Sequence, residues 1–177
     1  MKKFLTVWLT MYLQLWCVRA FTRTNFFIQK LEDCDPRNRS KVSFNLYTRN
    51  NEQYCDFDAI VEVPLDERVG ARFTIDTTVN GQQYIPLTNI YDKNFCVVCK
   101  KYGGEFFYDF QRAMQVNPGT CPMTKRHYRV RNYKMDFSKI SLQTFPFGKL
   151  RMTVNVIENA NQNVVFCFRA NVENKIN

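Results

Sequence analysis

Residues 150–170 read LRMTVNVIENANQNVVFCFRA, and this stretch decides the fold class. Apolar side chains occupy every second position over residues 150–156, which is the period of a strand with one buried face. A second alternating run, residues 164–170, follows a polar stretch at 158–163. The pattern predicts a β-hairpin whose two strands share one apolar face.

The same alternation extends through the part of the chain that precedes the hairpin. It recurs over residues 42–47, 55–63 and 73–79, and Asn80-Gly81 is a turn signal before extended structure resumes at 84–87. We find no internal repeat and no Pro/Gly/Ser-rich linker. The sequence therefore predicts a single all-β domain, folded as a two-sheet sandwich.

Two segments interrupt this rhythm. The first carries apolar side chains at helical spacing and ends at Asn117-Pro118-Gly119, so it predicts one short amphipathic helix. Its apolar residues are Phe106, Phe107, Phe110, Ala113 and Met114. In the second, residues 128–137, the apolar positions change phase. A bulge near Asn132 explains the change, and so does a strand that bends toward the other sheet.

The N-terminus has the layout of a secretory signal peptide. Met1-Lys2-Lys3 precedes an uncharged, mostly apolar run at residues 4–18, and Val18-Arg19-Ala20 resembles a cleavage site. The run is short for a membrane span, and no later segment is long and apolar enough for one. We expect a signal peptide at residues 1–20 and a secreted, extracellular, soluble domain at 21–177.

Cleavage would change both the cysteine count and the charge. The seven cysteines become six when Cys17 is lost, and an even number in an oxidising compartment predicts a disulfide framework. Spacing alone leaves the pairing open. The formal net charge falls from +9 to +6 with the loss of Lys2, Lys3 and Arg19. Such a protein tends to meet anionic surfaces, and outside the cell nucleic acid is not the expected partner.

Catalytic and metal sites find little support in the sequence. Cys96-Val97-Val98-Cys99 lacks the βαβ setting of a redox CxxC, so structural disulfides are favoured. Zinc ligands could come from these two cysteines with Cys121 and His127, although the spacing is unusual. His127 is the only histidine, and no nucleophile elbow accompanies it. We expect neither an enzyme nor a cofactor.

Three further features each allow more than one interpretation. The basic run at residues 125–131 is either a rim that binds phosphate, sulfate or carboxylate groups or a solvated strand face. Asn38-Arg39-Ser40 is a glycosylation sequon in a polar loop, so we expect a glycan on Asn38. The phenylalanine-rich inner faces either fill a core or line a cavity for an apolar ligand.

Several motifs of the second half resemble a known family. Cys121-Pro122 followed by a basic loop and Tyr128-Arg129-Val130 is similar to an element of ganglioside-activator-like proteins, members of the ML lipid-recognition superfamily. Residues 145–151, FPFGKLR, resemble the strand start of that family, and residues 95–99 resemble the stretch before it. The similarity is closest to the insect branch that includes the CheA and CheB chemosensory proteins.

The resemblance implies an immunoglobulin-like β-sandwich whose sheets part around a lipid. It also implies three disulfides, Cys34–Cys167, Cys99–Cys121 and Cys55–Cys96. In the insect branch the ligand would be a fatty acid, a cuticular hydrocarbon or a similar pheromone-like molecule. A sensory receptor or a membrane surface would be the further partner.

We therefore expect a monomeric, non-enzymatic binding protein for a lipid or another hydrophobic small molecule. Lys125, Arg126, Arg129 and Arg131 would form a basic rim for the polar head. Strand and helix phase predicts these lining residues: Phe44, Phe57, Val61, Phe73, Ile75, Phe110, Met114, Leu150, Met152, Val154, Phe166 and Phe168. The alternative is a secreted interaction module with a filled core that binds a receptor or an anionic glycan.

Overall fold

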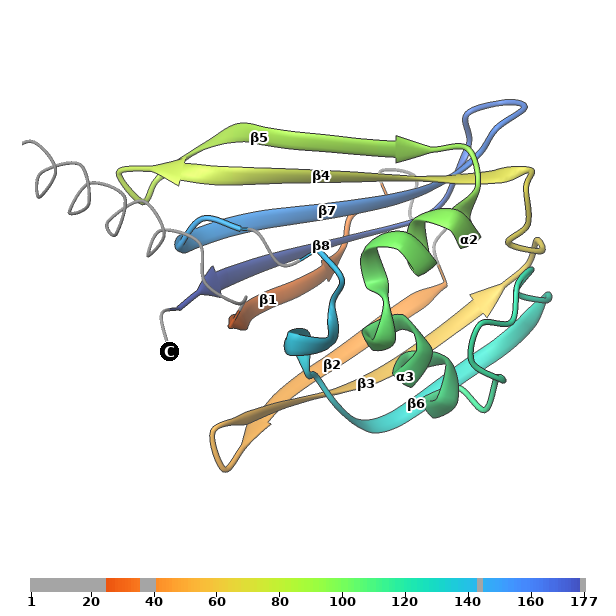
Figure 1. Cartoon of the computed structure of the whole chain (residues 1–177), viewed down its shortest axis with the longest axis horizontal. Helices are drawn as coiled ribbons and strands as arrows, with labels where there is room; N and C mark the ends of the chain where they lie inside the picture. The colour runs from red at the N-terminus through yellow and green to blue at the C-terminus, as the bar shows by residue number, and fades with distance from the viewer. Residues whose placement is uncertain (1–24, 36–40, 143–144, 176–177) are drawn as a thin grey trace, which may run out of the picture.

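The computed structural model describes residues 25–35, 41–142 and 145–175. The predicted signal segment at 1–20 and the Asn38 sequon lie outside the described residues. Within the described ranges, eight strands form two antiparallel sheets that face each other (Figure 1). This confirms the predicted all-β sandwich.

The larger sheet has five strands in the order β1-β8-β7-β4-β5, and the smaller has three in the order β2-β3-β6. The strands of the larger sheet are β1 (Phe26–Asp33), β4 (Val69–Val79), β5 (Gln83–Asp92), β7 (Gly148–Glu158) and β8 (Val164–Asn174). Those of the smaller sheet are β2 (Val42–Arg49), β3 (Glu52–Val61) and β6 (Arg126–Lys134). The hairpin expected from residues 150–170 is the β7–β8 pair.

A helical segment runs along one side of the sandwich, between β5 and β6. It consists of α2 (Phe95–Val98), a π-helical turn η1 (Cys99–Gly103) and α3 (Glu105–Ala113). In Figure 1 it passes from the larger sheet down to the smaller one, and α2 contacts β4 and β5 while α3 contacts β6. The amphipathic pattern correctly predicted α3, whereas α2 and η1 are additional.

Two residues, Asn94 and Gly104, fix the geometry of this helical segment. The side chain of Asn94 caps α2 by accepting from the backbone amides of Cys96 and Val97, at 3.0 and 3.3 Å. Gly104, at φ 56°, separates η1 from α3, and a Cβ there would lie 2.0 Å from Ser141 Oγ. Only glycine therefore fits between the helices and the loop that follows the short 3-10 helix η2 (Phe137–Lys139).

A buried glutamine joins the two sheets on the opposite side. The amide of Gln53, in β3, accepts from the backbone N–H of Ile28 and donates to its carbonyl, both at 2.7 Å. Ile28 is next to a bulge in β1, where the register with β8 shifts before Lys30. The glutamine side chain thus satisfies backbone groups of β1, which is an edge strand of the larger sheet.

The bulge expected near Asn132 is present in β6. Cys55 pairs with Tyr133 and Phe57 pairs with Val130, so β6 has one residue more than β3 over this interval. Asn132 has a positive φ of 54°, and its backbone N–H donates to Asp56 Oδ1 at 2.9 Å. The change in apolar phase along β6 follows directly from this extra residue.

The disulfides correct part of the expected pairing. Cys34 is bonded to Cys167, as the family resemblance implies, and this bond links the end of β1 to β8. Cys96 is bonded to Cys121, so the expected Cys99–Cys121 and Cys55–Cys96 bonds are wrong. Cys55 and Cys99 are free thiols, which leaves two disulfides among the described residues. The second bond attaches α2 to the segment that enters β6.

Buried apolar side chains form two clusters rather than one. The first surrounds the helical segment and includes Leu65, Val98 and Val156. The second lies around β1, β7 and β8 and includes Phe26 and Leu150. Members of both clusters line the cavity described below. Among the described residues, no helix combines the length and the hydropathy that crossing a bilayer requires.

Candidate functional site: an apolar cavity between the sheets

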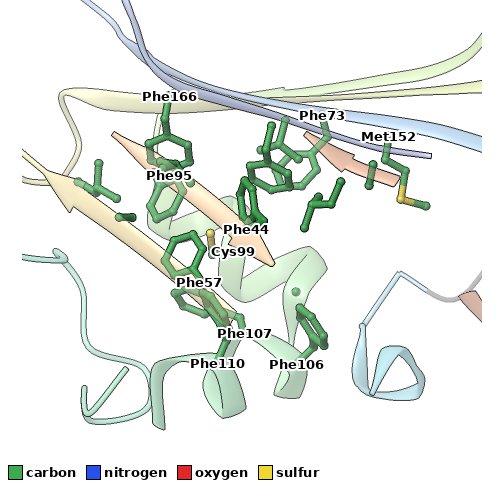
Figure 2. Close-up of a pocket in the computed structure, with 18 of the residues that line it drawn as sticks. Phe44, Phe57, Phe73, Phe95, Cys99, Phe106, Phe107, Phe110, Met152 and Phe166 are labelled. Carbon is green, nitrogen blue, oxygen red and sulfur yellow. The ribbon is translucent and has the colours of Figure 1, made fainter. Parts of the chain in front are cut away.

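The two sheets and the helical segment enclose a cavity of about 500 Å³. Its volume falls in the range of small-molecule binding sites. Figure 2 shows Phe73, Met152 and Phe166 reaching in from the larger sheet, with Phe57, Phe107 and Phe110 on the opposite wall. The walls are mainly aromatic and aliphatic side chains, so the space suits an apolar occupant.

Strand alternation explains why these side chains meet. Every second residue of a strand points to the same face, and the inner faces of both sheets carry the apolar phase of the sequence. Of the predicted lining residues, all but Leu150 line the cavity. Leu150 is fully buried in the second apolar cluster, so it belongs to the packed core instead.

Several lining residues were not predicted as such. Phe95 and Cys99 come from α2 and η1, which the sequence pattern did not reveal. Phe106 and Phe107 were assigned to the amphipathic helix, and their position on its apolar phase was the signal that could have placed them in the wall. Further lining residues from the segment after β6 are Met135, Phe137, Ile140, Leu142 and Phe145.

Ring contacts fix the aromatic wall. The rings of Phe44 and Phe57 lie 5.5 Å apart on neighbouring strands, and Phe57 meets Phe110 of α3 edge-to-face at 5.2 Å. Phe44 also contacts Phe168 of the larger sheet at 5.9 Å, so this contact crosses between the sheets. The wall is therefore pre-organised by contacts within the protein.

The two free thiols both face the cavity. Burial, with a smaller effect of the nearby Asp56 carboxylate, raises the pKa of Cys55 to about 11. Burial also raises the pKa of Cys99. Both groups are consequently neutral thiols at physiological pH and behave as small apolar wall residues rather than as nucleophiles.

Charged side chains line the cavity only at one end, among the described residues. Lys41 precedes β2, Glu62 follows β3 and Glu158 ends β7. Lys41 Nζ lies 2.5 Å from Glu62 Oε1, and both side chains are more than half exposed. Glu158 Oε2 accepts from Asn161 Nδ2 at 2.7 Å. We call these three residues the charged end of the cavity.

None of the four basic residues expected to form a rim belongs to the cavity wall itself. Lys125, Arg126, Arg129 and Arg131 are exposed, and none of them lines the cavity. In β6, Tyr128 and Val130 take the inner positions, so the alternating positions of Arg129 and Arg131 face solvent. There the guanidinium groups of both arginines pair with Asp58, at 3.4 and 3.2 Å. Arg129 and Arg131 are therefore corrected to an outer face of the smaller sheet. Arg126, in contrast, shares the phase of Tyr128, and its guanidinium lies over that ring at 5.6 Å.

A zinc site built from the CxxC cysteines does not fit the structure. Two of its four ligands, Cys96 and Cys121, are joined in a disulfide and cannot act as thiolates. The fourth, His127, is hydrogen-bonded to Asp58 on the outer face. No cluster of metal-ligating side chains occurs within residues 25–35, 41–142 and 145–175.

Comparisons with known proteins give a likeness in structure but no match in sequence. No family model matches the sequence, and no curated protein matches it. Among solved structures, chicken MD-1 complexed with lipid IVa is similar, with a TM-score of 0.45. The two chains are 12% identical, and the similarity covers 89% of this chain and 96% of that one.

Proposed function

We propose that this protein binds a lipid or another hydrophobic small molecule in the cavity between its sheets, without chemical conversion. The observation that carries the proposal is an interior space of about 500 Å³ with aromatic and aliphatic walls. Burying an apolar chain there would stabilise the complex by about 0.8 kcal/mol for each methylene group removed from water. A filled-core interaction module would not need such a space.

The setting of this activity is the extracellular one. The signal-like N-terminus and the disulfide Cys34–Cys167 support secretion. The motif resemblance to the insect branch of ganglioside-activator-like proteins supports a role in chemosensation, with a pheromone-like ligand. The protein would carry or present its ligand to a sensory receptor or a membrane surface.

Two matched substitutions in β7 test the proposal. Val154 lines the cavity, whereas the neighbouring Thr153 lies on the opposite face of the strand. Val154→Phe adds a ring to the ligand space and should weaken uptake of the neutral fluorescent probe N-phenyl-1-naphthylamine at least about tenfold. Thr153→Phe adds the same ring outside and should change uptake less than twofold.

Folding of both variants would be checked by far-UV circular dichroism and thermal melting. If Val154→Phe fails to fold, Met152→Trp repeats the test from a second wall position. Native mass spectrometry of the secreted protein would add an independent readout, with co-purifying lipid as the expected result. A protein that is always empty and takes up no probe would contradict the proposal.

A further inference from the structure

The smaller sheet brings several charged side chains to the charged end of the cavity, where β3 ends and β2 and β6 begin. Lys41 Nζ lies 2.5 Å from Glu62 Oε1, and both residues line the cavity. The hydrogen bond and charge of Lys41, and then the charge of Lys125, hold the pKa of the Glu62 carboxyl below its ordinary value. Because interactions between charges weaken with distance, Lys125 adjoins the charged end of the cavity.

Arg126 brings a further cation to the same end. It pairs with Val61 of β3, and Tyr128, two residues later, pairs with Ala59. Val61, Ala59 and Tyr128 all line the cavity, and alternation gives Arg126 the same phase as Tyr128. The guanidinium lies 5.6 Å from the centroid of the Tyr128 ring, whose hydroxyl donates to the Thr124 carbonyl at 2.7 Å. A fixed aromatic ring of the wall thus positions this charge at the end of the cavity.

The guanidinium of Arg126 is the group of this end best suited to an anion. It carries five N–H donors in a planar fork, and a contact between its face and a ring leaves the donors at its edge available. The Glu62 carboxylate is paired with Lys41, and Glu158, across on the larger sheet, accepts from Asn161 Nδ2 at 2.7 Å. A carboxylate or phosphate matches the fork in charge and in shape.

We infer that the ligand is an amphiphile with an oxyanion head, a carboxylate or a phosphate, which binds Arg126 while its apolar chain lies between the sheets. This inference rests on the proposed function and specifies the head of the ligand for the same cavity. Lys41 and Lys125 offset the repulsion between Glu62 and the head. Because Arg126 is exposed, the head keeps contact with water, which lowers the cost of binding a charged group there.

The inference is tested by competition against bound N-phenyl-1-naphthylamine at neutral pH. The competitors share one chain length and differ in the head: laurate, dodecyl phosphate, methyl laurate and dodecylamine, each below its aggregation concentration. We expect laurate and dodecyl phosphate to bind at least about fivefold more tightly than methyl laurate, and dodecylamine to bind more weakly than all three.

A matched pair of substitutions in β6 assigns the head to its site. Arg126→Gln removes the charge and keeps a long polar side chain, so the affinity for laurate should fall about tenfold while that for methyl laurate changes less than twofold. Arg129→Gln is the control, because it removes the same charge from the same strand at a position that faces solvent and pairs with Asp58. Its affinity for laurate should change less than twofold.

The outcomes separate this inference from the proposed function. If methyl laurate binds as tightly as laurate, or if the two variants lose equal affinity for laurate, the inference is overturned while a hydrophobic binding function stands. Tighter binding of dodecylamine than of laurate would assign this end to a cation and would also overturn it. If neither the probe nor any competitor binds, the proposed function fails and the inference fails with it.

Discussion

Asp58 is the acidic centre of the outer face of the smaller sheet. Its carboxylate is hydrogen-bonded to His127 and pairs with Arg129 and Arg131. These contacts, the His127 hydrogen bond first, hold the pKa of Asp58 below its ordinary value of 3.8. The run that suggested an anion-binding rim is thus largely occupied by a carboxylate of the protein itself.

Asp58→Asn should therefore alter how stability depends on pH. A carboxylate whose pKa is lower in the folded state stabilises the fold above its unfolded pKa, and this contribution is lost as pH falls through the folded pKa. Because the site is solvent-exposed, we expect a cost below about 1 kcal/mol at neutral pH and none at an acidic pH below the folded-state pKa of Asp58. Urea unfolding of the unchanged protein and of Asp58→Asn at both pH values would measure this difference in stability. If both proteins lose the same stability as pH falls, the assignment is contradicted.

Most of the residues that strand phase predicted for the wall do line the cavity, such as Phe57 and Phe168, because alternation decides which side chains point inward. It could not separate Leu150 from Met152, which share that phase. Leu150 lies in the packed core, whereas Met152 lines the cavity. The difference depends on how far apart the sheets stand at each position, which is a long-range property.

At the level of elements, the sequence could not decide which cysteine of the helical segment is bonded to Cys121. Cys96 and Cys99 are three residues apart, about one helical turn, so both project from the same side of the helix. A small rotation of the turn selects which sulfur meets Cys121, and the structure selects Cys96. The bulge at Asn132, in contrast, shifted the apolar phase and was predictable from it.

Replacing each of these two cysteines should separate the alternatives. Cys96→Ala removes the bond to Cys121 and should cost about 2–4 kcal/mol in the free energy of unfolding. Cys99→Ala removes only a thiol that faces the cavity, so we expect a loss below about 1 kcal/mol. Denaturant unfolding measures both losses. A larger loss of stability from Cys99→Ala than from Cys96→Ala would contradict the Cys96–Cys121 bond and support a Cys99–Cys121 bond instead.

Mass spectrometry supplies the chemical readout for this pair. Alkylation of the denatured but unreduced protein should mark Cys55 and Cys99 alone among the cysteines of the described residues. Trypsin leaves Cys96 and Cys99 on one peptide, because Lys93 and Lys100 flank them both. The Cys99→Ala protein therefore gives the unambiguous map, in which the link to Cys121 should survive.

At the scale of the whole molecule, the alternation of apolar residues predicted the sandwich, but it did not decide whether the interior is a filled core or a cavity. A filled core and a cavity wall need the same apolar side chains on the same faces. The cavity lies between the five-stranded and three-stranded sheets, which are joined along one side by α2–η1–α3 and on the other through Gln53. Both joints are contacts between segments that are far apart in the sequence, so strand periodicity does not reveal them.

Signal cleavage, which remains a prediction, has a spectroscopic test. Both tryptophans of the chain, Trp8 and Trp16, lie in the predicted signal segment. The secreted protein should therefore emit only tyrosine fluorescence, with an N-terminal sequence that begins at Phe21. Tryptophan emission from the purified extracellular protein would show that the segment is retained.

The cavity also bears on how the sequence of such a protein can change during evolution. Leu150 and Val156 are enclosed on all sides, so an exchange there requires a compensating exchange elsewhere. Wall residues such as Phe73 and Met152 adjoin the cavity, so each can be replaced by a larger or smaller side chain without a second substitution. A lineage built on this scaffold could therefore shift its preferred cargo by single substitutions while the architecture stays constant.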